Sequence, residues 1–542
     1  MTLGRSALAA GGATIGIVSL SMAIAVAGQA PSTPSGAKTE CGDLTKLTFE
    51  GNTTIATATS VAGGTLVTPA GQTLKGLPAF CRVTGVSKPS SDSNINFEVW
   101  LPSSSWNGKF LSSGEGGYAG TLNYTRSGLD GGMDELIRRG YASASTDTGH
   151  AATDTSWSIG HPDKVIDYAY RSKHLVTVAA KGLIAAFYGR PATRSYFNSC
   201  SNGGRQGLME VQRYPADYDG VVVGAPWNYQ SHSNAGFVWD AQVLSAPGAA
   251  ISAAKLPAIH AAALAACDAK DGLADGVIED PSRCTFDPAT IMCKGAETDA
   301  CLTEPQVGAL KKLYDGPRNP RTGAQIFPGW ARGSELGWAR SVVSANVTNL
   351  GQTYFARLVF QNPAWDYRTF NFDSDMSVAE SKVGKLADAI DPDLSAARRR
   401  GVKIVQYHGW DEQTLQPGNS PDYYRRVVAA MGAGNTEDFY RLFMVPGMTH
   451  CYFGAGASSF GGVGQQIPPT RDALHDIQAA LEQWVEHGTA PNTLIATKYV
   501  DEAAQSTTVK LTRTLCPHPL VAHYKSGNPN DAASFVCTKP SP

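Results

Sequence analysis

Short apolar runs alternate with helical segments through much of the chain. Strand-like runs occur at residues 97–101, 109–111, 141–147, 194–198, 219–226, 402–407 and 439–445. Apolar residues recur at helical spacing in residues 133–139, 175–188, 206–213, 423–431 and 473–486. Strands that alternate with helices favour a mainly parallel sheet covered by helices on both faces, so the pattern predicts an α/β fold.

The alternation fades between Trp227 and about Arg400, where the composition shifts toward Trp, Gly and Pro. We interpret residues 227–400 as a large inserted lid domain that divides the catalytic domain into residues 41–226 and 401–542. The lid is rich in aromatic side chains that suit the wall of a pocket for a ring-bearing substrate. We expect two or three of them to touch a ligand and the rest to form the lid core: Trp227, Trp239, Trp330, Trp338, Tyr354, Phe360, Trp365 and Tyr367.

The N-terminus reads as an export signal over residues 1–30. Arg5 is its only basic residue, and residues 7–27 carry no charge. An uncleaved membrane anchor is the alternative, although Gly11, Gly12 and Gly16 weaken such a helix. Residues 31–40 are expected to be a linker. The prediction is a secreted or periplasmic protein with no stable membrane association after signal removal.

Charge and cysteine content limit the classes of function. The 542 residues have a formal net charge of −2, which gives no support to nucleic-acid binding. The ten cysteines are an even number, as disulfides in an exported protein require. Their positions suggest the local pairs Cys41–Cys81, Cys267–Cys284, Cys293–Cys301 and Cys516–Cys537, with Cys200 and Cys451 remaining, although other pairings stay open. The oligomeric state cannot be read from the sequence.

Ser201 is the candidate nucleophile, because it stands at a turn between a strand-like run and a helical one. A serine at such a corner is exposed, and the N–H of the following residue, Asn202, can stabilise an oxyanion. The usual Gly-x-Ser-x-Gly pattern is imperfect because Ser199 replaces the first glycine. The glycine-rich run 113–120 offers a second oxyanion donor near Gly117. An ordinary loop at Ser201 and a flexible surface turn at 113–120 are the alternatives.

A candidate base and acid lie downstream of the serine. His450 follows a strand-like run and the turn Pro446-Gly447, and Asp411 and Glu412 follow another run. The order serine, acid, histidine is that of α/β-hydrolases. If Cys200 and Cys451 form a disulfide, their Cα atoms lie about 5 to 6 Å apart and bring Ser201 and His450 together. His150 precedes the serine, and we expect it to be structural.

A cysteine-bracketed loop in the lid carries oxygen ligands at a spacing that suits calcium. The expected ligands are the carboxylates of Asp268, Asp271 and Asp275 and the carbonyls of Leu273 and Val277. The loop is not a standard EF-hand, since Ser282 stands where the bidentate glutamate belongs. A solvated acidic turn is the alternative. Such an ion would fix the lid and have no catalytic duty.

These motifs resemble those of the tannase and feruloyl esterase family, which includes mono(2-hydroxyethyl) terephthalate hydrolase. The resemblance extends from about Cys41 to the C-terminus. It rests on Cys200-Ser201-x-Gly-Gly-Arg205, the glycine run 114–120, Cys267-Asp268 through Asp275-Gly276, Tyr407-His408-Gly409-Trp410 and Gly447-Met448-x-His450-Cys451. It implies an α/β-hydrolase fold with an inserted lid domain, a structural Ca²⁺ in the lid, and five disulfides including one between Cys200 and Cys451.

The resemblance also implies a catalytic set and a substrate class. Where the family has His-Gly-x-x-Asp, this chain places Glu412 in the acid position, with Asp411 one residue early as the alternative acid. The expected function is a serine carboxylic-ester hydrolase acting on small feruloyl or galloyl esters through an acyl-enzyme, without an organic cofactor. Mono(2-hydroxyethyl) terephthalate-like esters are an alternative substrate, and a catalytically inactive calcium-stabilised binding protein is the alternative from another class.

Substrate selection within that class is not readable from the sequence. The arginines of the lid are candidates for pairing with a substrate carboxylate, and the sequence does not choose among Arg332, Arg340, Arg357 and Arg368.

Overall fold

The computed structural model describes residues 38–126, 131–343 and 348–540. The predicted signal at 1–30 and residues 31–37 of the predicted linker lie outside the described residues. The first element of the structure is a 3₁₀ turn at Cys41–Lys46, which follows the last three residues of the predicted linker.

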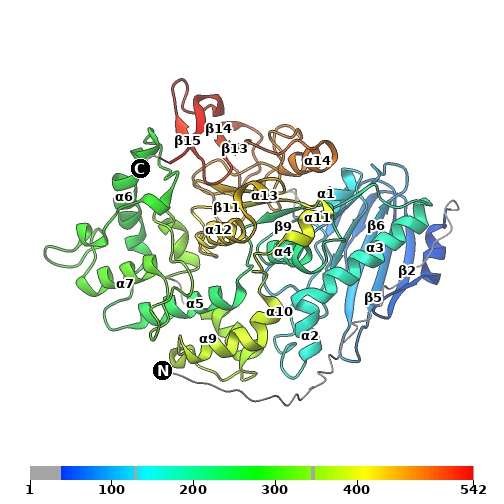
Figure 1. Ribbon diagram of the computed structural model, residues 1–542, viewed down its shortest axis with the longest axis horizontal. Coiled ribbons are helices and arrows are strands. Elements are labelled where there is room, and N and C mark those ends of the chain that lie inside the picture. Colours follow the sequence, from blue (N-terminus) through cyan, green and yellow to red (C-terminus); the bar gives the residue numbers. More distant parts are fainter. Residues whose placement is uncertain (1–37, 127–130, 344–347, 541–542) are drawn as a thin grey trace, which may run out of the picture.

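A five-stranded parallel sheet forms the centre of the molecule, in the order β12-β11-β10-β9-β7 (Figure 1). Its strands are β7 (Lys109–Ser112), β9 (Arg194–Cys200), β10 (Gly220–Gly224), β11 (Lys403–Gly409) and β12 (Tyr440–Val445). Gly224 pairs with Cys200 on one side and Tyr407 on the other. The carboxyl ends of β9, β10 and β11 therefore lie in one row, which confirms the predicted α/β class.

An antiparallel sheet continues the parallel one. Its order is β1-β2-β5-β6-β8, and an isolated bridge between Phe110 and Ala142 joins it to β7. The strands are β1 (Thr48–Phe49), β2 (Thr53–Val61), β5 (Phe80–Ser87), β6 (Ile95–Pro102) and β8 (Ser143–Thr146). A separate hairpin pairs β3 (Gly64–Val67) with β4 (Thr73–Leu77). The antiparallel strands up to β5 fall in a segment for which the apolar pattern gave no prediction.

Helices cover both faces of the parallel sheet because successive strand residues point to opposite sides. Val221 and Val223 of β10 belong to a cluster with Leu183 and Val427, whereas Val222 belongs to a cluster with Trp484. The first face is covered by α3 (Ser172–Tyr188), α4 (Asn202–Arg213) and α12 (Asn419–Met431). The second is covered by α1 (Met133–Arg138) and α14 (Ile477–His487). Short helices α2 (Pro162–Ile166) and α13 (Ala433–Glu437) complete this part.

The chain between β10 and β11 forms a largely helical insertion beside the sheet, drawn in green to yellow in Figure 1. Its helices are α5 (Gln230–Ser245), α6 (Leu256–Cys267), α7 (Glu304–Asp315), α8 (Thr348–Thr353), α9 (Ser374–Ala379), α10 (Lys385–Ala387) and α11 (Ser395–Arg400). All eight aromatic side chains proposed for a pocket wall pack in or against its two hydrophobic clusters. Trp338 and Tyr354 are fully buried there, as expected for core residues.

The C-terminal strands reach back to the insertion. They form two hairpins, β13 (Leu494–Tyr499) with β14 (Val509–Leu515) and β15 (Val521–Tyr524) with β16 (Phe535–Thr538). Arg513 pairs with Asp275 at 2.6 Å, and the N–H of Ala522 donates to Glu279 at 2.8 Å. The end of the chain is therefore fixed to the loop that carries the proposed calcium ligands.

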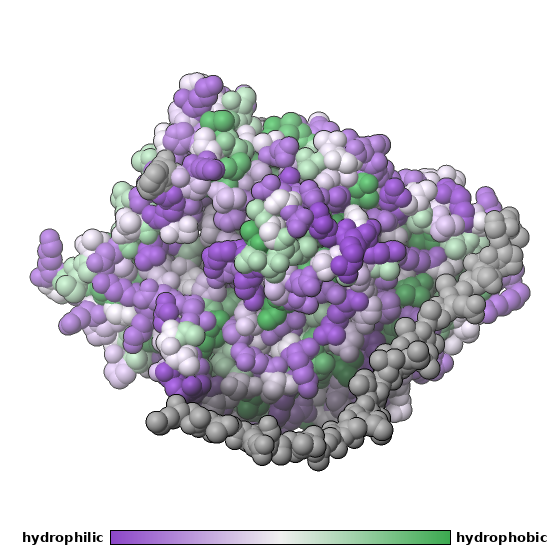
Figure 2. Space-filling view, in the orientation of Figure 1, coloured by the Kyte–Doolittle hydropathy of each residue, from purple (hydrophilic) through white to green (hydrophobic). Residues whose placement is uncertain are grey.

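The face of the molecule that Figure 2 draws is mostly hydrophilic. Figure 2 shows polar residues over most of the face it draws, with scattered hydrophobic ones between them. Within residues 38–126, 131–343 and 348–540, no helix has the length and apolar character that crossing a bilayer requires.

Candidate active site

Ser201 occupies a constrained turn between β9 and α4. Its backbone has φ 66° and ψ −128°, a region that non-glycine residues seldom adopt and that is typical of a nucleophile elbow. Its N–H donates to the carbonyl of Gly224 at 2.9 Å, and its own carbonyl accepts from the N–H of Trp227 at 3.0 Å. The neighbouring strand and the start of the insertion therefore fix the turn.

Ser199 stands where the usual elbow motif has a glycine. Its side chain fits because Gly203, four residues later, has no side chain. A Cβ atom on Gly203 would lie 2.0 Å from Ser199 Oγ and 2.7 Å from Ser199 Cβ. The serine thus fits only against a glycine. Its hydroxyl is buried, and it has no hydrogen-bond partner among the described residues.

Glu412 and His450 are in contact. His450 Nδ1 lies 2.8 Å from Glu412 Oε2, while Glu412 Oε1 accepts the backbone N–H groups of Thr414 at 2.7 Å and Leu415 at 3.1 Å. Glu412 is fully buried. Burial by itself would raise its pKa, but His450 and His408 lower the pKa of Glu412 to about 2. The carboxylate is therefore ionised and can hold the Nδ1–H tautomer of His450.

Asp411, the alternative acid, has a different environment. Its N–H donates to the carbonyl of Met448 at 3.0 Å. Burial raises the pKa of its carboxyl to about 7. The nearby His260 lowers this pKa, and the charge of Glu335 raises it. The side chain in contact with the histidine is that of Glu412.

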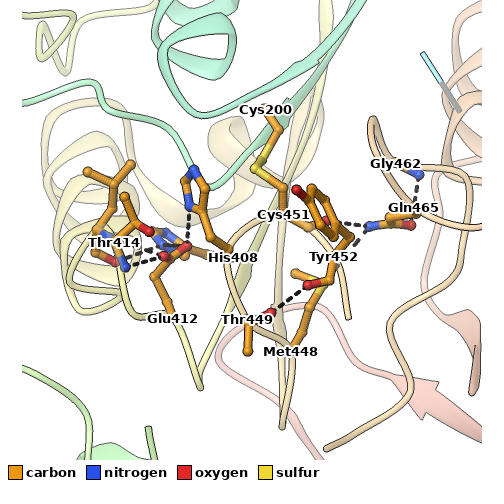
Figure 3. The surroundings of a disulfide bond; sticks show 12 residues. Cys200, His408, Glu412, Thr414, Met448, Thr449, Cys451, Tyr452, Gly462 and Gln465 are labelled. Carbon is orange, nitrogen blue, oxygen red and sulfur yellow. Dashed lines mark hydrogen bonds and ion pairs between the residues drawn. A yellow bond between two sulfur atoms is a disulfide. The ribbon is translucent and has the colours of Figure 1, made fainter. Parts of the chain in front are cut away.

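A disulfide connects the nucleophile and histidine segments. Cys200 and Cys451 are bonded, with their Cα atoms 6.0 Å apart (Figure 3), and Ser201 and His450 are the residues next to them in the chain. Gln465 Nε2 donates to the carbonyl of Cys451 at 3.2 Å and supports the histidine side of the bridge. The other disulfides present are Cys41–Cys81, Cys267–Cys284, Cys293–Cys301 and Cys516–Cys537.

The proposed oxyanion donors come from the first residue of α4 and from the glycine-rich loop. Asn202 begins α4, where the N–H groups have no partner within the helix. Its side chain bonds the carbonyl of Glu115 at 3.1 Å, which ties the helix to the loop. Gly117 has φ +56°, a conformation that favours glycine.

His150 contacts the glycine-rich loop 113–120 through the backbone of Tyr118. Its Nε2 lies 2.8 Å from the carbonyl of Tyr118, and its ring stacks on Trp157. Burial lowers the pKa of His150 to about 4, so the ring is neutral at pH 7. This placement suits the structural role expected for it.

The proposed calcium ligands share one loop of the insertion. Both carboxylate oxygens of Asp268 accept backbone N–H groups, from Asp275 at 3.2 Å and Gly276 at 2.9 Å. Burial, with the charges of Asp275 and Asp268, raises the pKa of Asp271 to about 6. Carboxylate oxygens are donors that Ca²⁺ prefers, but Asp275 already pairs with Arg513 at 2.6 Å. The carbonyls of Leu273 and Val277 lie in the same loop.

Three of the four arginines proposed to pair with a substrate carboxylate are in contact with other residues of the chain. Arg332 lies over the ring of Tyr314 at 4.5 Å, and Arg368 pairs with Asp366 at 3.1 Å. Arg357 donates to the carbonyl of Thr155. The sequence analysis did not single out Glu115, Lys173 or Gln465, which support the site; a lone charged residue among the glycines of 113–120 was the available signal for Glu115.

A family model described as "Tannase and feruloyl esterase" matches residues 81–538. The chain belongs to this family. It is a carboxylic ester hydrolase, and its mixed sheet is that of the α/β-hydrolases.

Similar proteins support the assignment. An uncharacterized esterase of Xanthomonas campestris is 41% identical over 93% of this chain and 92% of its own length. The mono(2-hydroxyethyl) terephthalate hydrolase of Piscinibacter sakaiensis is 34% identical over 90% and 89%. The crystal structure of feruloyl esterase B from Aspergillus oryzae superposes with a TM-score of 0.84 at 28% identity, over 91% of this esterase and 98% of that chain.

The fit between Ser199 and Gly203 can be tested by a suppressor. Gly203→Ala should lower the free energy of unfolding of this esterase by about 1 to 3 kcal/mol, because the added methyl overlaps a side chain in a closely packed turn. Adding Ser199→Gly removes both overlapping atoms and should recover most of the loss. Urea unfolding measures both effects. Equal stability of the single and double variants would show that Ser199 is not the obstacle.

The buried Glu412 carboxylate makes stability depend on pH. Its folded pKa of about 2 lies below the ordinary value of 4.5, so its contribution is complete above pH 4.5 and is lost as the pH falls toward 2. Glu412→Gln should therefore destabilise the fold by about 3 kcal/mol at pH 7. The difference from the parent should shrink between pH 4.5 and 3 in urea unfolding. A difference that stays constant across this range would contradict the low pKa.

Proposed function

We propose that this chain is an exported serine esterase that hydrolyses esters of small aromatic acids, feruloyl or galloyl esters first, through an acyl-enzyme. The observation that carries the proposal is the contact of His450 with the ionised Glu412, together with the disulfide that joins the residues adjacent to Ser201 and His450. The family and the similarity to feruloyl esterases support the substrate class. The five disulfides support an oxidising compartment outside the cytoplasm.

In the proposed reaction, Ser201 Oγ attacks the ester carbonyl while His450 takes its proton. The N–H groups of Asn202 and Gly117 hold the oxygen that becomes negative. His450 then gives the proton to the departing alcohol, which leaves the acyl group on Ser201. Water, deprotonated by His450, attacks this ester and releases the aromatic acid. Glu412 stays ionised throughout and stabilises the imidazolium.

A terephthalate half-ester is the second candidate substrate. It is favoured by the 34% identity to the hydrolase of Piscinibacter sakaiensis over most of both chains. The feruloyl, galloyl and terephthaloyl groups are all flat aromatics.

We further propose that Asp268, Asp271 and Asp275, with the carbonyls of Leu273 and Val277, hold a structural Ca²⁺. The ion would neutralise the carboxylates that repel one another in this loop.

Replacement of the nucleophile tests the reaction. Ser201→Ala should abolish hydrolysis of methyl ferulate, methyl gallate and mono(2-hydroxyethyl) terephthalate, and it should prevent labelling by a fluorophosphonate probe. Ser199→Ala is the matched control, because it removes a hydroxyl two residues away that has no bonding partner in the described residues, and it should keep both activities. Undiminished turnover by Ser201→Ala would refute the assignment, and the ratio of rates across the three esters identifies the acyl preference.

Chelation tests the calcium proposal. Removing Ca²⁺ with EDTA should lower the melting temperature by several degrees, since a ligand bound only to the native state stabilises it, and added Ca²⁺ should restore it. Asp271→Asn should melt at the lower temperature and respond to neither treatment. Asp287→Asn, at an exposed site of the same insertion, should respond like the parent. A melting temperature of the parent that is unchanged by EDTA would exclude a stabilising ion.

A further inference from the structure

Glu115 is a buried charge in the glycine-rich loop. It is the only charged residue in the run 113–120, and it is 3% exposed. Its Oε1 accepts from Lys173 Nζ of α3 at 3.1 Å and from Ser145 Oγ and Thr146 N of β8, each at 3.2 Å. Its Oε2 accepts from Gln206 Nε2 of α4 at 3.0 Å. One carboxylate therefore connects the loop to three separate elements.

The backbone around Glu115 is held by the same partners. Its N–H donates to Gln206 Oε1 at 3.1 Å, and its carbonyl accepts from Asn202 Nδ2 at 3.1 Å. Lys173 Nζ also donates to the carbonyl of Ser113 at 2.8 Å. The loop is thus bonded directly to the first turn of α4, the turn that carries the N–H of Asn202.

Close packing reinforces these bonds. A Cβ atom on Gly114 would lie 2.5 Å from Gln206 Oε1 and 2.7 Å from the Cα of Gly203, so the loop rests on α4 with no space between them. Further along, Gly116 and Gly117 have open space around them. Glycine has more backbone freedom than any other residue, so the position of Gly117 depends on the attachments on either side of it, at Glu115 and at Tyr118, whose carbonyl lies 2.8 Å from His150 Nε2.

We propose that Glu115 is a positioning residue that holds the two oxyanion donors at a fixed separation, through its ion pair with Lys173 and its bonds to Gln206 and Asn202. Donors of this kind act because they are fixed before the reaction begins. The inference rests on the proposed function, since it takes Asn202 and Gly117 as the donors.

Glu115→Gln should lower kcat for methyl ferulate by about 10- to 1000-fold, up to the loss seen when one oxyanion donor is removed. KM should change less than about twofold, because the donors act mainly on the transition state. The rate of labelling by a fluorophosphonate should fall in parallel, since its P=O oxygen occupies the same position as the oxyanion.

Glu98→Gln is the matched control for the loss of a buried ion pair. Glu98 is 4% exposed and bonded to Arg82 at 2.9 Å, with no role in the loop. Both Glu98→Gln and Glu115→Gln should lower the melting temperature, because each breaks a buried ion pair. Glu98→Gln should leave kcat unchanged. In Glu115→Gln with Lys173→Met both buried charges are absent, so stability should return while kcat stays low.

The outcomes separate this inference from the proposed function. If Ser201→Ala is inactive but Glu115→Gln keeps the parent's kcat, the positioning role is wrong and the reaction stands. If kcat recovers together with stability in the double variant, Glu115 is only structural. If Ser201→Ala stays active, the proposed reaction fails, and the inference fails with it.

Discussion

The disulfide between Cys200 and Cys451 is the contact on which the geometry of the site depends. The parallel sheet brings the ends of β9, β11 and β12 to one edge, but strand pairing ends before the residues Ser201 and His450 that follow β9 and β12. The bridge connects the two segments across 251 residues of sequence. In the chain-entropy account, closing a loop of this length stabilises the fold by roughly 5 kcal/mol. The disulfide therefore stabilises the fold and also limits the distance between the chain segments that carry Ser201 and His450.

Three carboxyl groups in or near the proposed site have different properties because their surroundings differ. Glu412 is kept ionised by His450 and by two backbone N–H groups, so its charge is available to the imidazole. Glu115 is paired with Lys173, so its charge is used to hold a loop. Asp411 is buried near His260 and Glu335, and its pKa rises to about 7. The same functional group orients a histidine, anchors a loop or has a raised pKa according to the groups around it.

The parts that the sequence predicted are those with a strong periodic signal. The parallel strands follow continuous apolar runs such as Val221 to Val223, because strands buried on both faces have no polar side. The antiparallel strand β2 has the pattern Thr-Thr-Ile-Ala-Thr-Ala-Thr-Ser-Val with several exposed positions, which resembles a loop as much as a strand. The register of the family motif favoured Glu412 over Asp411 as the acid, but spacing alone does not show which of two neighbouring side chains faces the histidine. The sequence likewise does not show which partners the Glu115 side chain bonds.

The insertion is also coupled to the histidine loop. A Cβ atom on Gly447, three residues before His450, would lie 3.1 Å from Val277 Cγ2, so the loop with the proposed calcium ligands packs against the turn that carries the histidine. The same loop is bonded from the other side by Arg513 and Ala522 of the C-terminal strands. The loop with the proposed calcium ligands therefore contacts both the turn before His450 and the C-terminal strands. If the proposed Ca²⁺ binds in this loop, it stabilises a segment that packs against the turn before His450 and has no part in the reaction itself.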